Sequence, residues 1–216
     1  MHIIQDIWNI STIIKRLSWM REKACQDDYL RQMWMFFAGV DIEIFHIELR
    51  AIMNYVAELI SEYTNKKGVV PTSFRKLYQW LPRNSENQKI LGEDFTNLIV
   101  SAKWFPDILN IRDMLIHQGA FTLVFGKPED GILFQIYRDG YRELISKDFY
   151  ILKENIASFE RYAALYISQL LLFLEQFAKI FRNKLSFTSD IKDSRISAAG
   201  FDVLIQWIDI SIEHIN

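Results

Sequence analysis

The chain has little glycine, proline or cysteine, and each shortage narrows its fold class. Eight glycines and four prolines among 216 residues are about half of the usual share, which favours long helices over a many-stranded sandwich. The single cysteine, Cys25, cannot form an internal disulfide, and no Cys/His cluster has zinc-ligand spacing. We therefore expect a mainly α protein in a reducing, cytoplasmic compartment, with no structural metal and no cofactor.

An excess of positive charge is also lacking, since the formal net charge is −2 and the isoelectric point is about 6.1. No global field draws such a chain to nucleic acid or to an anionic membrane, so any RNA contact must be local. The first residues lack the basic start of a signal peptide, and the longest apolar run, residues 162–174, is too short to span a bilayer. We expect no membrane partner. A hydrophobic share of 50% excludes disorder.

Apolar residues spaced by three and four predict most of the helices. One stripe predicts an N-terminal helix over residues 3–21, which either packs in the core or binds a partner. Two adjacent stripes predict a broadly buried helix over residues 28–64, ended by Gly68. Shorter helices are expected from residue 74 to Pro82, over residues 93–103 and from Pro106 to Gly119, with a polar connection over residues 83–89. The N-terminal stripe consists of Ile3, Ile7, Ile10, Ile14 and Leu17.

The second half of the chain combines a hairpin with one long regular pattern. Residues 120–125 and 132–137 flank a loop with proline and two glycines, which predicts a β-hairpin, and a third short strand is expected through Leu144. The spacing from Phe149 to Ile180 predicts about nine turns of helix. Residues 186–200 are polar, and residues 201–212 fit a strand or a helix equally. We predict one domain over residues 1–216, a bundle of four to six helices with an inserted β-hairpin.

Motifs for common nucleotide, dinucleotide, zinc-protease and hydrolase sites are absent, which leaves one constellation that could support catalysis. Arg112, Asp113 and His117 share the last turns of a short helix. Asp113 and His117 are four positions apart, so the carboxylate could orient the imidazole. Arg112 lies about 140° from His117 around the helix, and its long side chain or a second subunit would bring the two together. Such a pair suits RNA cleavage by the 2′-hydroxyl, with His117 as acid or base and Arg112 on the phosphate.

The segment LNIRDMLIHQGA resembles the signature of the HEPN superfamily (higher eukaryotes and prokaryotes nucleotide-binding): arginine, a polar residue, then histidine after four to six intervening positions. The resemblance covers residues 34–185, with the helix over 3–21 and the extension over 186–216 as additions. It implies a helical bundle, a homodimer that pairs two motifs, and metal-independent endoribonuclease activity in a toxin or defence system. The alternative it leaves open is a non-catalytic module that binds a nucleotide or a protein, such as an antitoxin.

Several other polar residues have both a functional and a structural interpretation. Basic residues near two aromatic side chains, Tyr78 and Trp80, could form an RNA-backbone groove or a solvated helix end; they are Lys66, Lys67, Arg75 and Lys76. Asp41 and Glu48 are seven positions apart, a pair that suits acid–base work, metal binding or salt bridges. His46 lies among apolar neighbours, and we expect it to be a core residue.

Overall fold

The computed structural model describes residues 2–66, 68–139, 145, 149–152 and 155–184. The predicted extension over residues 186–216, with its ambiguous segment 201–212, lies outside this part, as do Lys67 and the proposed third strand through Leu144. Within the described residues the protein is mainly helical, with a small antiparallel sheet. The predicted class, mainly α with an inserted hairpin, is confirmed at this level. The predicted count of four to six helices is too low, because the described residues form seven α-helices.

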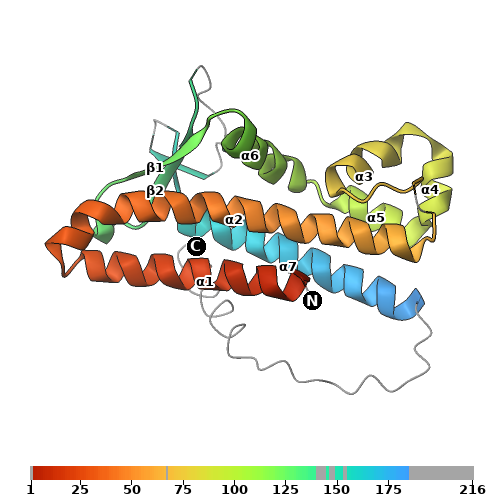
Figure 1. The fold of residues 1–216 in the computed structure, drawn as a ribbon, viewed down its shortest axis with the longest axis horizontal. Coiled ribbons are helices and arrows are strands. Elements are labelled where there is room, and N and C mark those ends of the chain that lie inside the picture. The colour runs from red at the N-terminus through yellow and green to blue at the C-terminus, as the bar shows by residue number, and fades with distance from the viewer. Residues whose placement is uncertain (1, 67, 140–144, 146–148, 153–154, 185–216) are drawn as a thin grey trace.

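Two long helices, α1 (His2–Ala24) and α2 (Asp28–Tyr63), run antiparallel along the length of the molecule (Figure 1). Asp27 caps α2 by accepting a hydrogen bond from the Leu30 backbone N–H. The N-terminal stripe is buried from Ile7 to Leu17, against α2. Of its two expected uses, core packing is confirmed, so this face is not free for a partner.

Only one of the two apolar stripes predicted on α2 is fully buried. Phe45, Leu49, Ile52, Val56 and Ile60 have no solvent exposure, whereas the neighbouring stripe remains partly open. Within that stripe, Phe37 is 44% and Val40 is 56% exposed. Leu59, near the end of α2, is 42% exposed, so the prediction that both stripes are buried is wrong for this second stripe.

The third long helix, α7 (Phe159–Lys184), is shorter than its spacing pattern. The predicted helix from Phe149 is wrong, because residues 149–158 contain two three-residue strands, β3 (Tyr150–Leu152) and β4 (Ile156–Ser158). Asn155, between them, has a φ of 64°, which breaks a right-handed helix. From Phe159 onward the pattern is confirmed, and its apolar positions pack in the core.

The strands form one four-stranded antiparallel sheet in the order β1-β2-β4-β3. The predicted hairpin is confirmed as β1 (Phe121–Phe125) and β2 (Leu133–Tyr137), joined by a 3₁₀ turn, η2 (Pro128–Asp130). β1 lies against α2, where a Cβ on Gly39 would sit 3.0 Å from the Thr122 carbonyl oxygen. Glu43 on α2 accepts the Thr122 backbone N–H at 2.9 Å. A glycine and a carboxylate thus fix the sheet on the long helix.

Short helices lie over the other end of α2 (Figure 1). They are α3 (Phe74–Trp80), a 3₁₀ turn η1 (Leu81–Arg83), α4 (Ser85–Leu91) and α5 (Glu93–Ser101). Helix α6 (Phe105–His117) lies over the middle of α2, beside the sheet (Figure 1). Helix α4 corrects the prediction of a polar connection over residues 83–89. Asn84 supplies its N-cap by accepting the Glu86 backbone N–H at 2.8 Å, and local polar contacts replace an apolar stripe.

By length and composition alone, α7 could cross a membrane. A core helix of a globular protein satisfies the same criteria, and the aromatic face of α7 packs against other elements, including Phe74 and Phe95. The expectation of no membrane partner, which rested on the shorter run over residues 162–174, stays a prediction.

Candidate functional site

The end of α6 presents the predicted catalytic residues. Proline at position 106 and Asp107 suit its first turn, while Ile108, Leu109 and Ile111 fix one face in the core. Gly119, with a φ of 70°, ends the helix, as predicted. The opposite face and the last turn therefore point outward, which leaves His117 exposed at the helix end.

Arg112 reaches His117 within the same helix. The guanidinium Nη1 lies 3.1 Å from the imidazole Nε2, so the long arginine side chain bridges the angle between the two positions. An arginine only donates hydrogen bonds, and Nε2 must therefore accept this one. A ring nitrogen that carries a lone pair is the form a general base requires.

The carboxylate of Asp113 is held by three arginines. Oδ1 accepts from Arg50 at 2.8 Å and from Arg112 at 3.1 Å, and Oδ2 accepts from Arg75 at 2.7 Å. The expectation that Asp113 hydrogen-bonds His117 is therefore wrong in the described chain, because the carboxylate faces the arginines instead. Asp113 positions guanidinium groups, and Arg112 rather than Asp113 contacts the imidazole.

Sequence reasoning missed Arg50, which comes from the middle of α2. Its side chain is 15% exposed, and its Nε atom is buried with no hydrogen-bond partner among the described residues. The pKa of Arg50 is lowered, mainly because burial disfavours its charged form. The positive charges of Arg112 and Arg75 also lower it, and the negative charge of Asp113 opposes them. In the sequence, Arg50 could have been noticed as a cation between Leu49 and Ala51, in the middle of a broadly apolar helix.

Of the three described residues that were predicted to bind RNA, one reaches the motif. Arg75, at the start of α3, lies in the site through Asp113, with 47% of its side chain exposed. Lys66 and Lys76 are exposed elsewhere on the surface, and Lys67 is outside the described residues. Tyr78 and Trp80 are partly buried and pack against the core. They therefore do not form an exposed surface on which RNA bases could stack.

The remaining polar candidates have structural roles. Asp41 pairs with Arg16 of α1, whose Nε donates at 2.7 Å, and Glu48 accepts from Asn9 at 3.2 Å, so the two acids have separate partners. His46 is fully buried: Nδ1 donates to the Ile42 carbonyl at 2.7 Å, and Nε2 accepts from the Tyr162 hydroxyl at 2.8 Å. Its burial lowers the pKa to about 4.

Two further features bear on ligands. The described residues contain no group of three or more His, Cys, Asp or Glu side chains suited to a metal ion. An open groove of about 460 Å³ lies between α5 and α7, lined by residues that include Asp94, Gln176 and Lys179. The motif residues do not line this groove, so the candidate site is the exposed end of α6 with its arginine cluster.

Comparison with known proteins identifies no relative of this chain. The chain matches no family model, no curated protein and no solved structure. The resemblance to the HEPN superfamily therefore stands on the motif over residues 112–117 and its helical setting.

Proposed function

We propose that this protein is a HEPN-like, metal-independent endoribonuclease. The observation that carries the proposal is the contact between Arg112 and His117 at the exposed end of α6, with a distance of 3.1 Å between Nη1 and Nε2. A phosphate-binding group thus lies beside an accessible ring nitrogen. The two cationic neighbours Arg50 and Arg75 supply the local positive charge that the chain, with a net charge of −2, lacks as a whole.

The proposed reaction uses the 2′-hydroxyl of the RNA as nucleophile. Arg112 first moves from Nε2 of His117 to the phosphate, which frees the lone pair of that nitrogen. His117 then takes the hydroxyl proton, the O2′–P bond forms, and the P–O5′ bond breaks to leave a 2′,3′-cyclic phosphate and a 5′-hydroxyl. Arg112 donates to the non-bridging oxygens, where negative charge grows. The leaving O5′ takes a proton from the histidine of a second copy of the motif, which is why we propose a homodimer. A toxin or defence setting, with an antitoxin as partner, belongs to the same proposal.

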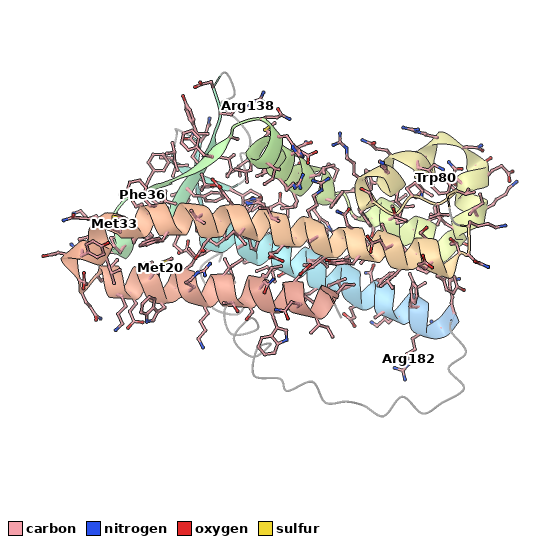
Figure 2. All side chains as sticks on the ribbon, viewed as in Figure 1. Met20, Met33, Phe36, Trp80, Arg138 and Arg182 are labelled. Carbon is pink, nitrogen blue, oxygen red and sulfur yellow. The ribbon has the colours of Figure 1, made fainter. Side chains whose placement is uncertain are left out.

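The test is degradation of single-stranded RNA by the purified protein in EDTA. We expect His117→Ala and Arg112→Gln to lower the rate by at least about 100-fold, with products that carry 2′,3′-cyclic phosphate. Arg182→Gln is the matched control, since this exposed arginine lies at the end of α7, away from α6 (Figure 2). Undiminished degradation by His117→Ala, or cleavage of a fully 2′-deoxy strand, would refute the assignment.

One observation favours the alternative, a non-catalytic interaction module. Near the start of α2, large apolar side chains are exposed: Tyr29 and Phe36 at 68%, with Phe37 and Val40 beside them in sequence (Figure 2). Patches of this kind often bind proteins. Phe36→Ser with Val40→Ser should abolish complex formation and leave RNA cleavage intact if the two functions are separate. Loss of both would show that the patch supports the nuclease.

A further inference from the structure

The ion pairs around Asp113 differ from others in the described chain. Pairs such as Arg16–Asp41 and Arg21–Glu160 give one cation a carboxylate. At Asp113, three arginines share one carboxylate, which leaves two positive charges in excess. Like charges held this close repel one another, particularly where burial weakens solvent screening. The cluster therefore offers a site to an anion.

The three arginines differ in how free they are to change partner. Arg50 is 15% exposed and Arg112 is 22% exposed, whereas Arg75 is 47% exposed. Arg75 projects from the first turn of a seven-residue helix, and its contact with Oδ2 is the only one that this oxygen makes among the described residues. An exposed ion pair contributes little free energy, so an exposed arginine can exchange one anionic partner for another at a small cost in free energy.

We infer that Arg75 is a further substrate-binding residue, which exchanges the Asp113 carboxylate for an RNA phosphate next to the one held by Arg112. Asp113 then serves as the anion that keeps the cluster together before RNA binds. Arg50, anchored in α2, holds the other carboxylate oxygen throughout and is a positioning residue. The inference rests on the proposed function for the identity of the ligand as RNA.

The arrangement explains why a single short motif could suffice in an acidic chain. Arg112 and Arg75 bind opposite oxygens of the same carboxylate, so they face one small area of surface. A phosphodiester strand that crosses this area meets two guanidinium groups next to the His117 ring. Two contacts fix the direction of the strand, whereas one contact fixes only a point.

The experiment measures binding of a 2′-O-methyl RNA oligonucleotide, which cannot be cleaved by the proposed route. Titration of wild type, Arg75→Gln and Arg182→Gln at several salt concentrations gives both affinity and salt dependence. The two variants lose the same charge and the same type of side chain, and Arg182 is exposed at the end of α7, away from the cluster (Figure 2). We expect Arg75→Gln to weaken binding at least tenfold and to reduce the salt slope by about one, and Arg182→Gln to change affinity less than threefold.

A second probe separates the ligand from the reaction. Inorganic phosphate should raise the melting temperature of wild type more than that of Arg75→Gln. Equal losses in the two variants, or a phosphate effect unchanged by Arg75→Gln, would overturn the inference. Tight binding that depends on Arg75 without any cleavage of ordinary RNA would keep the anion site and refute the nuclease. Cleavage and binding that are indifferent to Arg75 would keep the nuclease and refute the site.

Discussion

Arg50 Nη1 donates to Asp113 Oδ1 at 2.8 Å, and this contact joins the middle of α2 to the last turns of α6. Each side chain is 15% exposed, so the pair is poorly screened by solvent. The longest helix of the chain therefore carries a charge that fixes the motif helix. Because the same carboxylate also binds Arg75 and Arg112, its loss should affect the whole cluster.

Asp113→Asn tests that coupling. The variant keeps the size of the side chain but leaves three arginines without a counter-charge, so we expect the free energy of unfolding to fall by about 1–3 kcal/mol. Urea denaturation measures the change. Sulfate or phosphate at low millimolar concentration should recover more stability in Asp113→Asn than in wild type, because an anion replaces the carboxylate.

Glu86→Gln is the control for that experiment. Glu86 also pairs with a cation, Lys89, but both side chains are more than 60% exposed. An exposed pair contributes about 0–0.5 kcal/mol, so the control should unfold like wild type. A loss of the same size in both variants would show that the arginine cluster is no more sensitive to charge than the open surface.

Arg16→Gln should destabilise the packing of α1 against α2. Its partner Asp41 is 5% exposed at the side chain, so removal of Arg16 leaves a buried carboxylate without its cation. We expect a loss of about 1–3 kcal/mol, which is smaller than for a fully buried pair because Arg16 itself is 48% exposed. Chemical denaturation of Arg16→Gln and Arg16→Gln/Asp41→Asn distinguishes the causes, since the double variant should recover part of the stability.

The long helices were predictable because their stabilising contacts repeat along the sequence. Ile10, Ile14 and Leu17 recur with the helical period, and the structure buries all three. The strands β3 and β4 were not predictable on that basis. β4 is stabilised by pairing with β2, as in Phe134↔Ala157, and its first residue, Ile156, also fits the spacing of the helix that follows. A pattern of threes and fours cannot show where a strand gives way to a helix.

The candidate site was predicted only as far as one helix reaches. Arg112 and His117 are neighbours on α6, so their contact could be anticipated from the reach of an arginine. Arg50 is 63 positions from Asp113, and Arg75 is 38 positions away. Their convergence depends on how α2, α3 and α6 pack, which no local spacing encodes. For the same reason, the expected hydrogen bond between Asp113 and His117 does not form, because arginines from α2 and α3 bind the carboxylate.

Gly39→Val tests the contact between α2 and the sheet. A Cβ at this position meets the Thr122 carbonyl oxygen at 3.0 Å, and a branched side chain would force β1 away from the helix. We expect a loss of about 1–3 kcal/mol, the usual cost of overpacking. Val40→Ala is the control, because Val40 is 56% exposed and its truncation should cost little. Equal stability of Gly39→Val and wild type would mean that the sheet can shift without penalty.

Between pH 7 and 5, His46 should dominate the pH dependence of the free energy of unfolding. Burial lowers the pKa of His46 in the folded protein to about 4, against an ordinary value of 6.5. The unfolded chain therefore binds a proton near pH 6.5, while the folded chain resists it until about pH 4. Protonation favours the unfolded state, so stability is lost as the pH falls through this window. We expect a loss of about 2 kcal/mol from His46 between pH 7 and 5.

Urea denaturation of wild type and His46→Gln at both pH values isolates this contribution, because the glutamine cannot titrate. If His46→Gln lost as much stability as wild type over this range, the buried imidazole would not be the source of the pH dependence.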